Sequence, residues 1–179
     1  MIEVLETERL ILRPFDAGDL DSLAALFVEE SLWWFPLRRG MDRDETTRFL
    51  ERVTTTYDAP EPSLHAVIER STGLLAGYTG LSVPHFLPEV LPAVEVGWRL
   101  GENFWGKGYA TEAAKTALEW GFTRLGLSEV ISIAEPANTA STNVMDRLGF
   151  APGTFTFDPV RELKLVVRSL SEETWRRTR

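Results

Sequence analysis

The sequence contains no cysteine and only two histidines, His65 and His85. The lack of cysteine excludes disulfides, thiolate metal sites and cysteine nucleophiles. Two histidines are too few for a histidine-rich metal site and, with no cysteine, they argue against a nucleophile–histidine triad. We therefore expect no bound metal, and the chemistry has to be sought in other side chains.

Basic residues and long apolar stretches are also scarce. The chain has 19 Lys and Arg against 27 Asp and Glu, a formal net charge of −8. This balance argues against nucleic-acid binding, which depends on attraction to phosphates. No apolar stretch approaches the roughly 20 residues that span a membrane, and the opening MIEVLETERL carries acids where a signal peptide carries bases. We expect a cytoplasmic protein with no membrane or nucleic-acid partner.

The composition is that of a globular domain. The 179 residues are 44% hydrophobic and 26% charged, and a chain of this length buries roughly 70% of its unfolded surface. No repeat, low-complexity tract or linker divides the sequence. We therefore expect a single domain over residues 1–179.

Hydrophobic periodicity predicts an alternation of strands and helices. Strands are expected at residues 8–15, 63–70, 74–83, 93–100, 129–135, 155–157 and 161–170, and helices at residues 16–28, 42–53, 110–125 and 138–148. This order is typical of an α+β fold with a largely antiparallel sheet.

The longest predicted helix begins at Ala110 and follows the turn Gly106-Lys107-Gly108. The N–H groups in the first turn of a helix lack intrahelical partners, and the helix dipole adds positive charge there, so this junction is a candidate anion site. The alternative is that the two glycines only make a tight strand-to-helix turn. The glycine spacing fits neither the P-loop nor the dinucleotide-binding motif, which disfavours a nucleotide site.

Four segments resemble one known family, in the same order along the chain. They are TERLILRP at residues 7–14, WGKGYA at residues 105–110, EPANTAS at residues 135–141 and LGF at residues 148–150. Together they resemble the GNAT acetyltransferases of the ribosomal-protein N-terminal (Rim-type) branch, with Trp105 where that loop usually has Gln or Arg. The resemblance implies an α+β GNAT fold. Its central sheet is mixed but mostly antiparallel, with six to seven strands, about four flanking helices, and splayed strands at the acetyl-CoA site.

The resemblance also implies acetyl-CoA as the cosubstrate. Backbone groups of Trp98, Arg99 and Leu100 would pair with its pantetheine arm like an added strand. Asn138 would hydrogen-bond the same arm, or else cap the helix that follows it. The N–H groups that would hold the pyrophosphate belong to Gly106, Lys107, Gly108, Tyr109, Ala110 and Thr111.

Two residues are candidates for catalysis. Glu95 is the candidate general base, because an acid inside an apolar strand has a raised pKa; strand alternation also allows it to lie on a solvated face without any chemistry. Many relatives place a proton-donating tyrosine where this chain has Met145. Ser141 is the candidate acid, with capping of the first helical turn as the alternative.

The acceptor site is expected in residues 31–40 and beside His85. Trp33, Trp34 and Phe35 cannot all be buried in one short loop, although each singly could belong to the core. A lone histidine such as His85 is more often an ordinary surface residue.

The sequence and the resemblance together predict an N-acetyltransferase. It would move an acetyl group from acetyl-CoA to a primary amine, either a protein N-terminus or a small molecule. A non-catalytic acyl-CoA-binding module of the same fold stays an alternative because of Met145. The resemblance also allows a homodimer.

Overall fold

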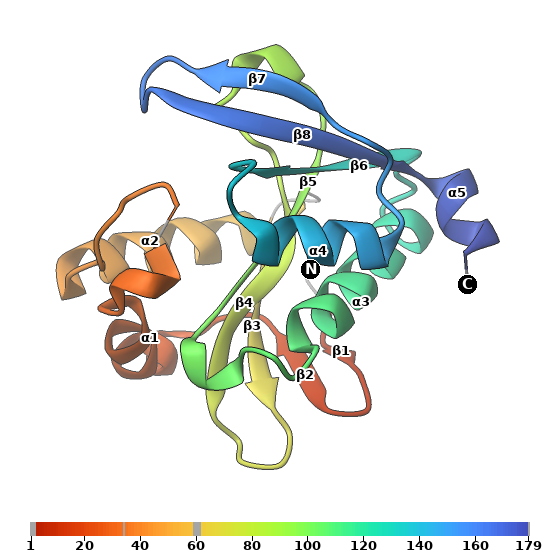
Figure 1. The fold of residues 1–179 in the computed structure, drawn as a ribbon. Helices are drawn as coiled ribbons and strands as arrows, with labels where there is room; N and C mark the ends of the chain where they lie inside the picture. The colour runs from red at the N-terminus through yellow and green to blue at the C-terminus, as the bar shows by residue number, and fades with distance from the viewer. Residues whose placement is uncertain (1–2, 34, 59–61, 179) are drawn as a thin grey trace.

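The computed structural model describes residues 3–33, 35–58 and 62–178 (Figure 1). Within these residues the chain forms one eight-stranded sheet and five α-helices. The strands are β1 (Leu5–Glu6), β2 (Leu10–Arg13), β3 (Leu64–Glu69), β4 (Leu75–Ser82), β5 (Glu95–Leu100), β6 (Glu129–Ala134), β7 (Thr154–Asp158) and β8 (Leu163–Ser171). The helices are α1 (Leu20–Phe27), α2 (Arg43–Thr55), α3 (Tyr109–Thr123), α4 (Thr139–Leu148) and α5 (Glu172–Arg177).

The sheet has the order β1-β2-β3-β4-β5-β6-β8-β7. Each neighbouring pair is antiparallel except β5 and β6, which are parallel. The expected α+β architecture with a mostly antiparallel sheet is confirmed. The described chain has one strand and one helix more than the periodicity predicted, β1 and α5, because elements of two and six residues are too short to show a period.

Local signals begin and end the helices. The Asp42 carboxylate accepts from the Glu45 N–H at 2.8 Å and the Glu45 carboxylate accepts from the Asp42 N–H at 3.0 Å, which forms a capping box at the start of α2. Gly126, with φ 68°, follows α3 in the left-handed region that suits a residue past a helix end. Of the helices in the described ranges, none is long and apolar enough to cross a membrane.

The helices form two layers, one on each face of the sheet (Figure 1). Phe27 of α1 and Phe49 of α2 pack with Ala66 of β3 on one face. On the other face, α3 and α4 pack over β4, β5, β6 and β8, and the buried side chains include Val96 and Leu118. The sheet is therefore covered on both sides, and its strand ends carry the exposed connections.

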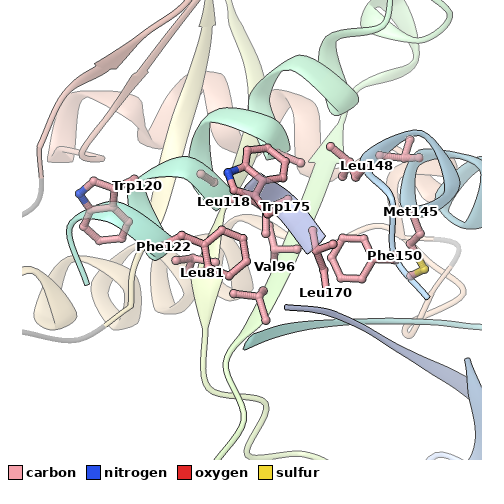
Figure 2. Close-up of a cluster of buried hydrophobic side chains, with 14 of the residues drawn as sticks. Leu81, Val96, Leu118, Trp120, Phe122, Met145, Leu148, Phe150, Leu170 and Trp175 are labelled. Carbon is pink, nitrogen blue, oxygen red and sulfur yellow. The ribbon is translucent and has the colours of Figure 1, made fainter. Parts of the chain in front are cut away.

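Figure 2 shows the larger of these cores, where side chains of α3, α4 and α5 meet the sheet. Gly121 brings α3 close to β4, since a Cβ there would lie 2.7 Å from Leu81 Cδ1. Burial of a large apolar side chain contributes about 1.5–3 kcal/mol, and Leu118 and Phe122 are among those that α3 buries here. This packing fixes the axis of α3, and with it the position of its N-terminus.

Candidate active site

The two parallel strands in the centre of the sheet pair at one position only. Glu95 of β5 lies opposite Ile131 of β6, and the Ile131 N–H donates to the Val94 carbonyl at 2.9 Å. Beyond this point the strands diverge, so that β5 runs steeply through the view while β6 crosses it (Figure 1). A gap between strands thus opens toward their C-terminal ends.

Just after this pair, side chains replace the backbone hydrogen bonds between β5 and β6. A continuing parallel ladder would next join the Ile133 N–H to the Val96 carbonyl. Instead, the buried Ser132 hydroxyl donates to the Val96 carbonyl at 3.1 Å. The Ile133 N–H bonds the Glu95 carboxyl group. Both backbone groups are satisfied without strand pairing, which lets the gap open without a desolvation cost.

The far half of β5 presents an unpaired edge to the gap. Arg99 lies opposite Tyr78, and the Gly101 N–H donates across to β4 at 3.0 Å, so the backbone groups of the odd-numbered residues face β4. The N–H groups of Trp98 and Leu100 therefore face the gap. The expectation that the Arg99 backbone also pairs with a ligand there is corrected, because its hydrogen-bonding groups point to β4.

Trp105 lies at the closed end of this edge. Its indole N–H donates to the Leu100 carbonyl at 2.5 Å. The side chain that replaces the usual Gln or Arg of the loop is therefore still a hydrogen-bond donor, and it holds the end of β5.

The N-terminus of α3 is open. Its N-cap residue, Gly108, provides no side-chain cap, whereas side chains cap α2, α4 and α5. Gly106 and Gly108 both have left-handed backbones, with φ 72° and 80°. A Cβ at Gly106 would meet no atom within 4 Å. A Cβ at Gly108 would lie 3.5 Å from Arg9 Nη2. The N–H groups of a first helical turn, beside two glycines and a guanidinium, are the geometry of an anion cradle.

The side chains of the loop point to other partners. The Lys107 ammonium lies 3.2 Å from Glu69 Oε1, and the Tyr109 hydroxyl donates to the same oxygen at 2.7 Å. The Lys107 ammonium has further donors and its side chain is 43% exposed, so both it and the backbone N–H groups of the loop stay available to an anion.

A second helix N-terminus flanks the gap at the end of β6. The Asn138 side chain accepts from the Ser141 N–H at 3.1 Å, so the predicted capping role of Asn138 is confirmed. The cap uses Oδ1 and leaves the amide N–H groups of Asn138 for another partner. Because α3 and α4 both begin after the C-terminal ends of parallel strands, the positive ends of both dipoles lie at this edge.

Met145 lies one helical turn before Leu148, in the core. It is fully buried, and Figure 2 shows it near Leu148 and Phe150. The position that carries a proton-donating tyrosine in many relatives is therefore a packing position in this chain. Ser141, the other candidate, lies in the first turn of α4.

Glu95, Gly97 and Arg99 form a row on the face of β5 that points away from α3. Burial raises the pKa of Glu95 to about 8, against the opposing effects of the Ile133 N–H and the Arg99 charge. A Cβ at Gly97 would meet no atom within 4 Å. Glu95 is half-buried on the face opposite Val96, as strand alternation predicted. An acid with a raised pKa thus borders an open space.

The Arg99 side chain is held in place on this face. Its Nε donates to the Tyr78 hydroxyl at 3.0 Å, and its Nη1 donates to the carbonyls of Leu32 and Phe35 at 2.5 and 2.7 Å. Its guanidinium carbon lies 4.1 Å from the centre of the Trp33 ring. Trp33 is only 4% exposed, so the expectation that it contacts an acceptor is corrected: its ring packs in the core and supports Arg99.

The other predicted acceptor residues lie at different places. Trp34 is outside the described residues. Phe35 is half-buried against the cluster that contains Ile131 and Ile133, on the same face as Glu95. His85 is exposed in the connection between β4 and β5.

Sequence reasoning missed an ion pair beside the gap. Arg38 Nη2 lies 2.8 and 2.6 Å from the two carboxylate oxygens of Glu135, which is 8% exposed and follows β6. Residues 35–38 are thus tied to β5 through Arg99 and to the end of β6 through Glu135. No local pattern signals a contact across 97 positions of sequence.

The sequence pattern described as Acetyltransferase (GNAT) domain matches residues 9–151. The chain belongs to the GNAT acetyltransferase family. It is an acyltransferase, and the α+β fold described above is the GNAT fold.

Relatives and solved structures agree with this assignment. The uncharacterized N-acetyltransferase p20 of Bacillus licheniformis is 27% identical over 150 residues, 83% of each chain. The acetyltransferase from Agrobacterium tumefaciens superposes with a TM-score of 0.75 at 26% identity, over 96% of both chains. RimL, a ribosomal L7/L12 alpha-N-protein acetyltransferase solved in complex with coenzyme A, superposes with a TM-score of 0.76 at 16% identity, over 94% of this chain and 98% of RimL.

Proposed function

We propose that this protein, as one GNAT domain over residues 1–179, transfers the acetyl group of acetyl-CoA directly to a primary amine. One observation carries the proposal. The gap between β5 and β6 meets an uncapped helix N-terminus behind a glycine loop, and the acid Glu95, with its raised pKa, stands at the start of the gap. This arrangement combines an edge for an extended arm, a cradle for a diphosphate and a group for proton transfer.

The residues present fit acetyl-CoA, which supplies the acetyl group as a thioester. The N–H groups of Trp98 and Leu100 would pair with the pantetheine arm as an added strand would. The side-chain amide of Asn138 would bond the arm from the other side of the gap. The N–H groups of the loop and of the first turn of α3 would bind the pyrophosphate, from Gly106, Lys107, Gly108, Tyr109, Ala110 and Thr111.

Glu95 is the proposed general base. Its carboxylate accepts the proton that the amine loses, directly or through one water, as the amine nitrogen bonds to the acetyl carbon and the C–S bond breaks. A base with a pKa near 8 has about a tenth of its molecules ionised at pH 7, and it is strong enough to accept a proton from an amine. The open space over Gly97 leaves room for the acceptor beside it.

Ser141 is the proposed proton donor to the departing thiolate, and its half-buried hydroxyl takes up a replacement proton from solvent water in the same step. Its backbone N–H is used by the Asn138 cap, but its hydroxyl lies in the first turn of α4, where the helix dipole favours negative charge. The buried Met145 offers no proton for this step.

The acceptor is proposed to be a protein N-terminus or a small amine. Solved neighbours such as RimL and a putative ribosomal-protein-serine acetyltransferase from Vibrio cholerae support the Rim-type branch and a protein N-terminus. Phe35 and His85, on the two connections beside Glu95, are the proposed acceptor contacts.

The experiment is an acceptor screen with acetyl-CoA. Peptides with free N-termini, polyamines, aminoglycosides, amino acids and an arylamine are tested for CoA release, and the acetylated product is identified by mass spectrometry. Glu95→Gln and Ser141→Ala are compared with two matched surface variants, Glu129→Gln and Thr139→Ala. We expect a loss of 100-fold or more for Glu95→Gln and wild-type rates for both controls. Full activity of Glu95→Gln and Ser141→Ala at saturating acetyl-CoA would remove both catalytic assignments.

The buried Met145 favours a second candidate, a non-catalytic acyl-CoA-binding module. This candidate predicts tight binding of acetyl-CoA and no acetylation of any amine in the screen. Acetylation of one amine that depends on Glu95 excludes it.

A further inference from the structure

Two carboxylates lie directly beneath the candidate anion cradle. Glu112 belongs to the first turn of α3, and Glu69 ends β3 and is 5% exposed. Unneutralised acids at this place would repel a diphosphate by like-charge interaction. The neutralisation of these two acids therefore bears directly on the affinity of the cradle.

Arg9 neutralises Glu112. Its Nε and Nη2 lie 2.7 and 2.5 Å from Glu112 Oε2, and its backbone N–H donates to Oε1 at 3.1 Å. The Thr7 hydroxyl donates to Oε1 at 2.6 Å. Burial alone would raise the pKa of Glu112, but the hydrogen bonds from Thr7 and Arg9 outweigh it and lower that pKa. Glu112 is therefore ionised and bound to Arg9.

Arg9 also reaches the loop itself. Its Nη1 donates to the Lys107 carbonyl at 2.8 Å, and its guanidinium carbon lies 4.8 Å from the centre of the Tyr109 ring. One side chain thus joins the segment before β2, the first turn of α3 and the middle residue of the loop.

Glu69 binds the side-chain end of Lys107, whose carbonyl Arg9 binds. It accepts from the Lys107 ammonium at 3.2 Å and from the Tyr109 hydroxyl at 2.7 Å, and the Thr72 hydroxyl donates to its second oxygen at 2.7 Å. Hydrogen bonds from Thr72 and Tyr109, followed by the effect of Lys107, lower the pKa of Glu69 against burial.

Lys107 stands between two glycines, the residues with the greatest backbone freedom. It is fixed at its carbonyl by Arg9 and at its ammonium by Glu69, so the loop between Gly106 and Gly108 keeps one conformation. An anion site that is already ordered binds without the cost of ordering it.

We propose that Arg9 and Glu69 are positioning residues for coenzyme A: they fix Lys107, and with it the backbone N–H groups that bind the diphosphate. This inference rests on the proposed function. It predicts that their removal weakens binding of the diphosphate part and leaves the reaction at the thioester intact.

The experiment separates the diphosphate from the thioester. CoA binding is measured by calorimetry, and kcat/KM is measured with acetyl-CoA and with S-acetylpantetheine, which lacks the diphosphate. The variants are Arg9→Ala, Arg9→Lys, Glu69→Gln and the double variant Arg9→Ala/Glu112→Gln. Arg176→Ala, which removes an exposed ion pair on α5, is the matched control.

For Arg9→Ala we expect the Kd for CoA to rise about tenfold, as for one lost charge-assisted contact. With S-acetylpantetheine, kcat/KM should change less than about twofold. Arg9→Lys keeps the charge but cannot reach both Glu112 and the Lys107 carbonyl, so it should recover part of the loss. The double variant also removes Glu112, the acid that Arg9→Ala leaves unpaired, so it should recover part of the lost affinity for CoA.

An equal loss with both thioesters, or an unchanged Kd for CoA in Arg9→Ala and Glu69→Gln, overturns the inference while the proposed function stands. Failure of the wild-type protein to bind CoA overturns the proposed function, and this inference with it. Arg9→Lys and Glu69→Gln preserve the size of the side chain, so a folding defect of Arg9→Ala does not decide the result.

Discussion

The pH dependence of acetyl transfer should follow the ionisation of Glu95. Burial raises the pKa of this carboxyl group to about 8 from an ordinary 4.5. If the carboxylate is the base, the active fraction is about one tenth at pH 7 and about nine tenths at pH 9. The rate constant kcat/KM should therefore rise about tenfold between pH 7 and pH 9.

The assay needs an acceptor whose own ionisation does not add to the profile. An arylamine is neutral over this whole range, so its pH–rate profile reports the enzyme. Glu95→Gln should show a rate lower by at least about 100-fold and no rise between pH 7 and pH 9. Glu129→Gln, a change of an exposed acid on β6, should keep the wild-type profile.

Stability gives an independent check on the same group. In the folded protein Glu95 holds its proton up to about pH 8, whereas in the unfolded chain it ionises near 4.5. The wild-type protein should therefore lose stability relative to Glu95→Gln as pH rises from 4.5 to 8. A flat pH–rate profile for the wild type, or the same tenfold rise in Glu95→Gln, would refute the assignment of Glu95 as the base.

Three other changes have definite expected outcomes. A Cβ at Gly97 would meet no atom within 4 Å, so Gly97→Val should fill the open space on the acceptor side: the melting temperature should hold while KM for the acceptor rises about tenfold or more in steady-state kinetics. Gly77→Ala places a Cβ 2.1 Å from the Arg99 carbonyl oxygen at φ 143°, and it should lower the unfolding free energy in urea by about 2–3 kcal/mol. Burial lowers the pKa of His65 to about 4, so the unfolded state binds a proton first as pH falls. Stability should drop by about 3 kcal/mol between pH 6.5 and pH 4 in urea titrations, and His65→Phe should lack that drop.

Local patterns in the sequence predicted the helices and the glycine turn before α3. The period of α3 and the glycines before Tyr109 are each contained within a few residues, and the structure places them as expected. The hairpin of β3 and β4 around residues 71–73 follows from its turn residues in the same way.

Contacts between distant residues were beyond such reasoning. The divergence of β5 and β6 depends on Ser132 and Glu95, which satisfy backbone groups of the opposite strand. Nothing in either strand's own pattern distinguishes these side chains from ordinary polar residues of a sheet. The partner of the Lys107 ammonium is Glu69, 38 positions away, and no local pattern signals this ion pair.

The aromatic residues before α2 were the hardest to place. The sequence pattern allowed Trp33 to be either an acceptor contact or a core residue. Its burial follows from packing against Phe27, whose ring centre lies 5.0 Å away, and from the Arg99 side chain above its ring. Phe27 belongs to α1 and Arg99 to β5, and these two elements meet at Trp33 only once the sheet has formed.

The most direct test of the whole account is a thermal-shift titration with acetyl-CoA, CoA, ATP and NAD. A ligand at 100 times its Kd stabilises a protein by about 2.7 kcal/mol, a shift of several degrees for a chain of this size. The account predicts this shift with acetyl-CoA and with CoA, and none with ATP or NAD. The absence of a shift with both CoA species would mean that the loop from Gly106 to Gly108 is only a turn, and it would contradict the proposed acetyltransferase site.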